Sequence, residues 1–377
     1  MKIVSNRRKV LRLLTTALGG IIAGVYGMPI LNGKLRKEVS PLLKITPLPK
    51  SGPWPTMDPF LFCVHHNDHY PKADSSMRPD ASLAGRDMGQ DFSNKDGWSM
   101  YHGREIPGFP QHPHRGFETL TVVNSGLIDH SDSLGARARY GDGDAQWLTA
   151  GDGIVHAEMF PLLNQDAPNP MDFFQIWINL PSAKKRVAPH FKMFWDTTIP
   201  KIKIQDELGE TEVTVVAGTY DSNQAPAPPP DSWAAEPNNG LAVWVINISK
   251  GSSWELPAAP SFVQRSLYLV KGDDVEMGDQ RVPEKSRIQI ESDQTILIKS
   301  KRSEAQLLLL QGRPIQEPVA QYGPFVMNNQ DEIREAFNDY NRTGFGGWPW
   351  EDSGPVHGHE PRRFAQLSDG TLDEPTL

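Results

Sequence analysis

The stretch QHPHRGFET at residues 111–119 places two histidines directly before an apolar, strand-forming run. Side chains two apart on extended backbone point to the same face, so His112 and His114 can bind one metal ion. The stretch GDGIVHAEM at 151–159 repeats this arrangement with His156 and Glu158 after a glycine-rich turn. Three imidazoles and a carboxylate on facing strands inside a barrel form a site that suits iron, manganese, nickel or copper, and an octahedral ion keeps two positions open there.

The sequence around these motifs predicts an all-β protein. With 33 prolines and 32 glycines among 377 residues, the chain favours short strands and loops. One series of strand-type runs lies within 117–180 and a second within 212–310, which indicates two barrels of similar size. One helix is expected at 329–340, where Asn329 can cap the first turn and Glu332 follows three residues later.

The carboxylate ligand has two candidates. His112, His114 and Glu118 fit the pattern His-x-His-x3-Glu, which, with the later glycine turn and His156, resembles the two cupin motifs. In many cupins the acid of that pattern binds the metal. Glu158 is favoured here because it shares a strand face with His156, and Glu118 is then expected to support the ligands from behind.

Longer stretches resemble the pirin family. They are HPHRGFET (112–119), DHSDSLGARAR (129–139), QWLTAGDGIVHAEM (146–159), and EPVAQYGPFVMN with its following helix (317–340). The resemblance implies two cupin barrels with one metal, usually iron, in the N-terminal barrel only. It also implies the ligands His112, His114, His156 and Glu158. The expected cofactor is therefore one divalent transition metal, Fe(II), with Mn, Ni, Cu and Zn as alternatives.

These observations divide the chain into segments. Residues 1–27 are an export signal, 28–190 the N-terminal metal-binding cupin domain, and 191–345 the C-terminal cupin domain with the helix at 329–340. Residues 346–377 are a polar tail, expected to pack loosely. Because no histidine occurs between His190 and His357, the second barrel is predicted to be metal-free.

The export signal combines five basic residues with an apolar run at 13–25. Arg7 and Arg8, followed by Lys9, Val10 and Leu11, resemble the twin-arginine motif, so a periplasmic location is expected. An ordinary secretory signal, or an anchor helix that stays attached, is the alternative. Without these five residues, 33 basic residues face 46 acidic ones, and a net charge of −13 argues against nucleic-acid binding. After signal removal we expect no membrane attachment and a monomer.

Two further features have open interpretations. A long insert at about 70–110 precedes the first motif and either lids the site or covers a barrel edge. The cluster His65-His66-Asn67-Asp68-His69 suggests a second metal site, but a polar turn is favoured because its members do not share one face. His357 and His359 in the tail are a similarly weak signal.

The resemblance implies two classes of function. Some pirins show quercetin 2,3-dioxygenase activity, in which a flavonol or similar phenol would bind the open metal positions and Glu158 would accept its hydroxyl proton as general base. Other pirins are non-catalytic regulators that bind a protein partner, here as a metal or redox sensor. A barrel with a purely structural metal is the third possibility. The first class is favoured because an exported protein would meet small phenolic substrates.

Overall fold

The computed structural model describes residues 40–376, in which strands predominate. The predicted twin-arginine signal at 1–27 lies outside the described residues. Among residues 40–376, no helix combines the length and apolar character needed to cross a bilayer.

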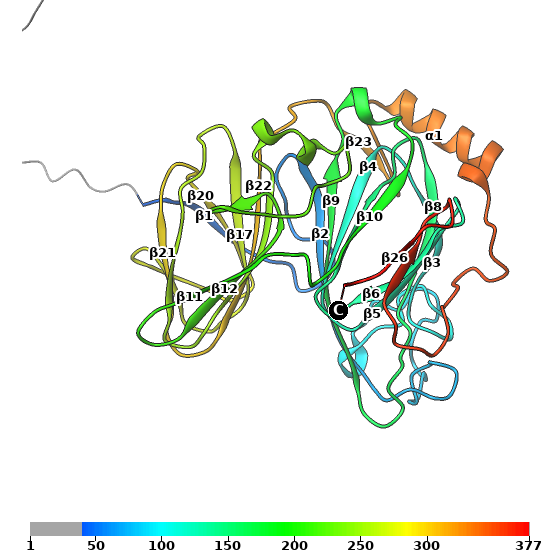
Figure 1. Ribbon diagram of the computed structural model, residues 1–377, viewed down its shortest axis with the longest axis horizontal. Coiled ribbons are helices and arrows are strands. Elements are labelled where there is room, and N and C mark those ends of the chain that lie inside the picture. The colour runs from blue at the N-terminus through cyan, green and yellow to red at the C-terminus, as the bar shows by residue number, and fades with distance from the viewer. Residues whose placement is uncertain (1–39, 377) are drawn as a thin grey trace, which may run out of the picture. The chain divides into compact units, whose positions relative to one another are not determined.

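The first barrel is built from two antiparallel sheets (Figure 1). The five-stranded sheet has the order β10 (His190–Phe194), β7 (Ala145–Thr149), β4 (Phe117–Ser125), β9 (Asn169–Asn179) and β2 (Phe60–Tyr70). The six-stranded sheet has the order β26 (Leu372–Asp373), β25 (Phe364–Gln366), β6 (Arg137–Gly141), β5 (Leu127–Asp132), β8 (Ile154–Met159) and β3 (Gly108–His114).

The second barrel has the same two-sheet construction. Its seven-stranded sheet has the order β1 (Leu42–Pro47), β20 (Ser286–Ile290), β17 (Gln264–Lys271), β22 (Ala305–Gly312), β15 (Ala242–Ile248), β12 (Glu210–Ala217) and β11 (Lys201–Gln205). Its four-stranded sheet has the order β16 (Ser253–Leu256), β21 (Ile296–Ser300), β18 (Val275–Met277) and β19 (Gln280–Val282). The predicted all-β fold with two cupin barrels and a short C-terminal helix is confirmed.

The remaining elements are short connections. Two hairpins are formed by β13 (Thr219–Tyr220) with β14 (Asn223–Gln224), and by β23 (Ala320–Tyr322) with β24 (Phe325–Met327). Short 3-10 helices lie at η1 (Lys95–Gly97), η2 (Ser182–Lys184), η3 (Trp233–Ala235), η4 (Pro237–Asn239) and η5 (Gly344–Gly346).

The run of four leucines at 307–310 in β22 explains how the barrels join. Leu307 and Leu309 point into the core of the second barrel. Leu308 and Leu310 point the other way, into a second core shared with β4, β7 and β9 of the first barrel. Because alternate residues of a strand face opposite sides, a continuous apolar run is buried on both faces. The five-stranded sheet of the first barrel thus packs on the seven-stranded sheet of the second.

Helix α1 (Gln330–Thr343) corresponds to the predicted helix, and the side chain of Asn329 accepts a hydrogen bond from the Glu332 backbone. Ile333 and Ala336 face inward and pack with Val155 of β8. The helix follows the second barrel in the sequence, yet it covers the outer face of the strand that carries His156.

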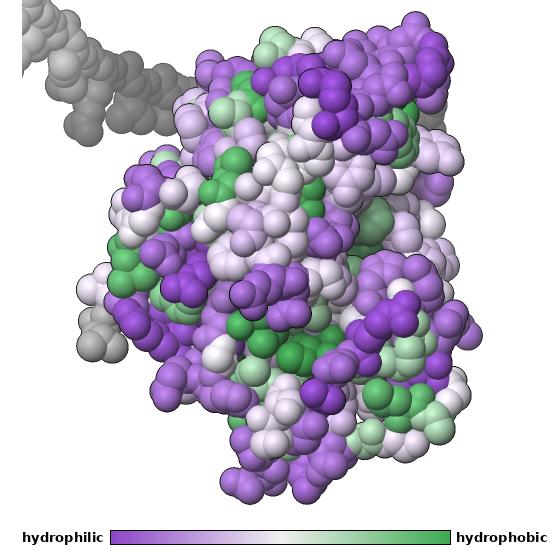
Figure 2. Space-filling view, turned by 90° about the vertical axis from the view of Figure 1, so that its right-hand side faces the viewer, coloured by the Kyte–Doolittle hydropathy of each residue, from purple (hydrophilic) through white to green (hydrophobic). Residues whose placement is uncertain are grey.

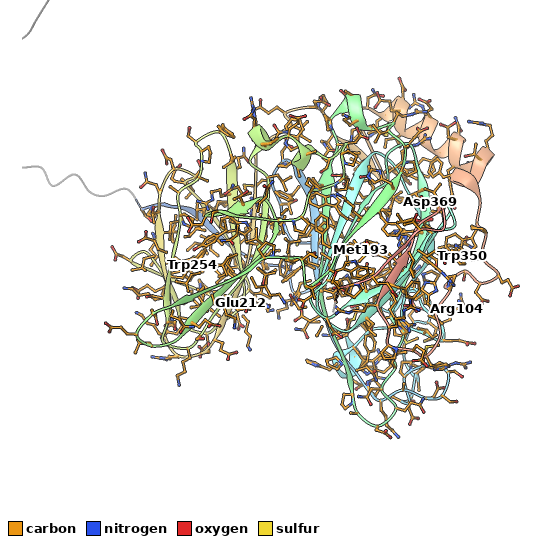
Figure 3. The ribbon with its side chains drawn as sticks, in the orientation of Figure 1. Arg104, Met193, Glu212, Trp254, Trp350 and Asp369 are labelled. Atoms are coloured by element: carbon orange, nitrogen blue, oxygen red, sulfur yellow. The ribbon has the colours of Figure 1, made fainter. Side chains whose placement is uncertain are left out.

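The C-terminal tail differs from the expected loosely packed segment. Strand β25 pairs with β6, and β26 pairs with β25, so the tail extends the six-stranded sheet of the first barrel. The Trp350 indole, labelled in Figure 3, donates to the Asp132 carbonyl at 2.9 Å, and His357 Nε2 lies 2.8 Å from the His130 carbonyl oxygen. Figure 2 shows the face on this side, where hydrophilic residues predominate and hydrophobic residues form separate patches.

Candidate metal centre

Strands β3 and β8 bring the three predicted histidines together. His112 stands directly opposite His156 in the antiparallel register, and His114 follows two residues later on the same face. The ring centroids of the three imidazoles are 4.4–4.9 Å apart. One nitrogen from each ring lies within 4.8 Å of the others, so all three can reach one ion.

The protonation state of these imidazoles suits a metal. Burial, with repulsion from neighbouring histidines, lowers the pKa of His112 to about 4 and those of His114 and His156 well below the usual value. His112 Nδ1 donates to the Pro110 carbonyl at 2.9 Å, which leaves its Nε2 lone pair free. Both ring nitrogens of His156 are buried without a hydrogen-bond partner among the described residues. Neutral imidazoles with free lone pairs are what a divalent ion binds, so the residues fit the predicted metal.

Glu158 lies beside this cluster. Its Oε2 is 3.9 Å from His156 Nε2 and accepts a hydrogen bond from Gln175 Nε2 at 3.0 Å. The Thr121 hydroxyl lies 3.3 Å from Oε1. Burial raises the pKa of Glu158. Glu158 therefore faces the barrel interior next to the histidines, and its predicted roles as fourth ligand and base stay predictions.

Glu118 faces away from the histidines. Its carboxylate accepts hydrogen bonds from Thr149 Oγ1 at 2.7 Å and from Ser232 Oγ at 2.6 Å, and Ser232 belongs to the C-terminal half of the chain. The reason is the corner between β3 and β4, where Gly116 has a φ of +85°. Even-numbered side chains point into the barrel before this corner and out of it afterwards. Among residues 40–376, no hydrogen bond or ion pair joins Glu118 to the three histidines or to Glu158, so the expected support of the ligands by Glu118 is not seen.

His130 is a neighbour that the sequence reasoning missed. It is fully buried on β5, stands opposite Glu158 in the register, and its ring centroid is 5.5 Å from that of His156. Its Nε2 lies 3.1 Å from Asp132 Oδ2. The segment DHSDS at 129–133 was the available signal, because His130 and Asp132 are two apart on one strand.

A cavity of about 580 Å³ opens onto His112, His114 and Glu158. Its lining is largely aromatic and comes from the strands (Phe62, Phe173, Trp177), from the insert (Phe92, Tyr101, His102, Phe109) and from Phe160, which follows β8. The Phe62 and Trp177 rings contact each other at 4.8 Å between centroids. The long insert, whose role the sequence left open, therefore forms a wall of the cavity.

The insert is firmly anchored. Arg86 and Asp91 form a fully buried ion pair at 2.9 Å, and the Arg86 guanidinium stacks 3.5 Å from the centre of the Trp98 ring. Asp68 of β2 accepts hydrogen bonds from Tyr101 Oη at 2.7 Å and from the Ser99 backbone at 2.9 Å. Such paired, buried polar groups hold a loop in one conformation. The insert is a fixed wall in this structure.

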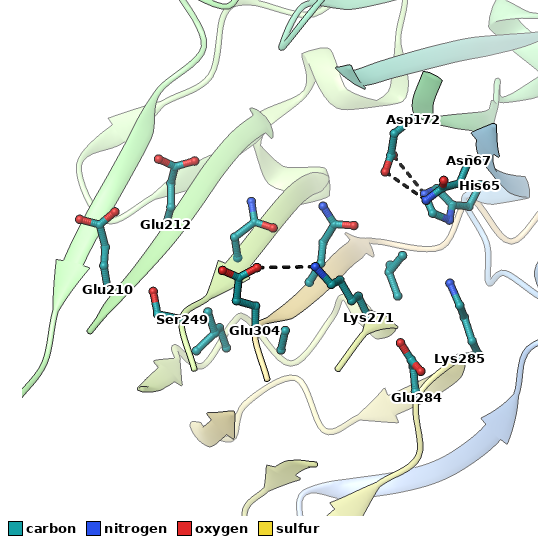
Figure 4. A pocket seen from close by; sticks show the side chains of 15 residues that line it. His65, Asn67, Asp172, Glu210, Glu212, Ser249, Lys271, Glu284, Lys285 and Glu304 are labelled. Atoms are coloured by element: carbon teal, nitrogen blue, oxygen red, sulfur yellow. Dashed lines mark hydrogen bonds and ion pairs between the residues drawn. The ribbon is translucent and has the colours of Figure 1, made fainter. Parts of the chain in front are cut away.

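The expectation that residues 65–69 form a polar turn is wrong. These residues lie within strand β2. Residues 65–68 all line the aromatic cavity. His65 and Asn67 also border a polar cleft of about 540 Å³ between the barrels, where His65 pairs with Asp172 at 3.1 Å (Figure 4). Lys271 and Glu304 form another ion pair in that cleft. The prediction that the second barrel holds no metal stays a prediction.

Comparison with known proteins agrees with this architecture. Residues 49–178 match the model of the pirin family, and residues 243–346 match that of the pirin C-terminal cupin domain. A Pseudomonas aeruginosa protein named "Putative quercetin 2,3-dioxygenase" is 35% identical over 63% of this chain and 79% of its own length. A pirin-like protein of Caulobacter vibrioides is 33% identical over 71% of this chain and 90% of its own.

The fold is also shared with a solved structure. A crystal structure of a quercetin 2,3-dioxygenase from Acinetobacter baumannii superposes with a TM-score of 0.64 at 26% identity, covering 81% of this chain and 98% of the other. Together with the two barrels and the histidine cluster on β3 and β8, these similarities establish that the chain belongs to the pirin family.

Proposed function

We propose that this chain is a metal-dependent dioxygenase that acts on a flavonol or a related phenol in its first barrel. The observation that carries the proposal is the aromatic cavity whose lining includes His112, His114 and Glu158. Relatives named as quercetin 2,3-dioxygenases support the same substrate class. A cavity with aromatic walls and a few polar groups at its inner end suits a flat, hydroxylated ring system.

Each residue at the cavity has a role in the proposed reaction that follows from its position. A divalent ion held by the three histidines would supply Lewis acidity at the inner end of the cavity. Glu158 is placed to accept a phenolic proton, and its raised pKa makes it a stronger base once it is ionised. Gln175 and Thr121 orient its carboxylate through hydrogen bonds. Phe62 and Trp177 offer faces on which a second ring can stack.

The proposal extends to the metal and the compartment. We infer that Fe(II) is the native ion, since the nitrogen and oxygen donor set suits it and pirins usually hold iron. We also propose that Arg7 and Arg8 direct export of the folded, metal-loaded protein to the periplasm. Metal analysis of protein purified from the periplasm tests the first statement, and fractionation of cells that express an Arg7→Lys, Arg8→Lys variant tests the second.

The test is anaerobic titration of quercetin into protein loaded with Fe(II), followed by admission of oxygen. We expect saturable binding, then oxygen consumption and loss of the flavonol spectrum. Glu158→Gln should lower turnover about 100-fold or more while it reduces metal content much less, because an amide cannot accept the proton. Binding without oxygen consumption in the iron, manganese, nickel and copper forms would overturn the proposal and favour a non-catalytic regulator.

A further inference from the structure

The second barrel contains a buried arginine near the start of β17. Arg265 is 2% exposed and lies on the same face of the strand as Leu267 and Leu269, which belong to the core between the two sheets of this barrel. The labelled Trp254 marks the region of this barrel in Figure 3. An arginine directed into an apolar core requires an explanation, since this residue type is rarely buried unless it is paired.

The hydrogen bonds of Arg265 are incomplete. Nη1 donates to the Pro257 carbonyl at 2.9 Å and lies 3.4 Å from the Ser292 carbonyl oxygen. Nε and Nη2 are buried and have no acceptor among residues 40–376. Burial lowers the pKa of Arg265 to about 10, and no carboxylate of the described chain opposes that shift. The guanidinium stays charged at neutral pH, and a buried charge without a counter-charge is strongly unfavourable.

A second unpartnered group lies on the adjacent strand. Gln311 pairs with Arg265 in the register of β17 and β22, so their side chains are neighbours on the same face. Gln311 Nε2 donates to the Gly240 carbonyl at 3.0 Å, which fixes the orientation of the amide. Its Oε1 is buried without a donor among the described residues. Two adjacent donors and one acceptor therefore remain free at this end of the barrel core.

We propose that the second barrel binds a small 2-hydroxy carboxylate through Arg265 and Gln311. The free Nε and Nη2 share one edge of the guanidinium, the edge that binds both oxygens of a carboxylate side by side. Gln311 Oε1 then accepts a hydrogen bond from the neighbouring hydroxyl. One guanidinium balances one negative charge, which favours a monocarboxylate over a phosphate dianion. This site is separate from the metal centre and does not depend on its chemistry.

The test uses thermal unfolding of the metal-loaded full chain in glycolate, acetate, phosphate or chloride at equal ionic strength. Glycolate should raise the unfolding midpoint in proportion to the logarithm of its concentration, by about 5 °C at a hundredfold excess over its Kd. Acetate should do so only at higher concentration, and Gln311→Leu should abolish that preference. The glycolate effect should persist in the His112→Ala, His114→Ala double variant, which excludes binding at the metal.

Arg265→Met should remove the glycolate effect, whereas Arg281→Met, at an exposed arginine of the same barrel, should retain it. In chloride, Arg265→Met should be at least as stable as the parent, because the uncompensated charge is gone. If Arg265→Met does not fold, Arg265→Gln takes its place. The proposal is overturned if glycolate does not raise the midpoint above that in chloride, if Arg265→Met or Arg265→Gln responds like the parent, or if crystals soaked in glycolate show only water bridging Arg265 and Gln311.

Discussion

Replacing Glu118 with Gln should change how stability depends on pH. Burial raises the pKa of Glu118 to about 7, although the hydrogen bonds from Ser232 and Thr149 act to lower it. An unfolded Glu titrates near 4.5, so between these pH values the folded protein holds a proton that the unfolded chain has lost. Stability therefore falls as pH rises from 4.5 to 7, by about 3 kcal/mol at roughly 1.4 kcal/mol per pH unit.

Glu118→Gln is neutral like the protonated acid: its Oε1 can accept a hydrogen bond from one of the two hydroxyls while its Nε2 donates to the oxygen of the other. The variant should match the parent at pH 4.5 and exceed its free energy of unfolding by up to about 3 kcal/mol at pH 8. Urea unfolding followed by tryptophan fluorescence at several pH values measures this difference. Glu255→Gln, at an exposed acid of the second barrel, is the control and should change nothing. If the free energies of unfolding of Glu118→Gln and the parent differ by the same amount from pH 4.5 to 8, the reasoning is refuted. If Glu118→Gln loses the metal, Glu118 is again a candidate ligand.

Three other outcomes are expected. The chain should bind about one transition metal ion, measured by elemental analysis, and His112→Ala with His114→Ala should abolish this; two tightly held ions would contradict the single site. Phe92→Ala should weaken quercetin binding about fivefold at unchanged metal content, since the exposed ring contributes about 1 kcal/mol of aromatic contact at the cavity wall; equal affinity would remove Phe92 from the site. Replacing Arg7 and Arg8 with Lys should leave folded, metal-loaded protein in the cytoplasm on fractionation, and undiminished export would exclude the twin-arginine route.

Features with a local signal could be predicted from the sequence. The i, i+2 spacing of His112 and His114 fixes a shared strand face wherever the strand lies, and the structure brings these rings to His156. Asn329 and the apolar face that follows it likewise determine a helix without reference to distant residues. The two barrels could be predicted from the two series of strand-type runs, because polar–apolar alternation and turn residues are local signals.

Features that depend on distant partners could not be predicted. The two-residue rule fails for Glu118 because the corner at Gly116 changes the strand face, and Ser232, one partner of its carboxylate, comes from the other half of the chain. Residues 65–69 show no polar–apolar alternation because polar side chains lie on both faces of β2, where His66 stacks on Phe173 and His65 pairs with Asp172, and such a run is typical of a turn. Arg265 gave no signal, since only its position in the barrel core makes it unusual.

The two ends of the described chain are exchanged between the barrels, and this has a consequence for folding kinetics. Strand β1 pairs with β20 of the second barrel, whereas β25 near the C-terminus pairs with β6 of the first. The buried Arg139 donates to the Gly358 carbonyl at 2.8 Å, a contact that spans 219 residues. Contacts of such long range slow folding, because a large loop must close before they form. During synthesis the barrel made first is thus completed last, and the histidine cluster reaches its final surroundings only after nearly the whole chain has left the ribosome.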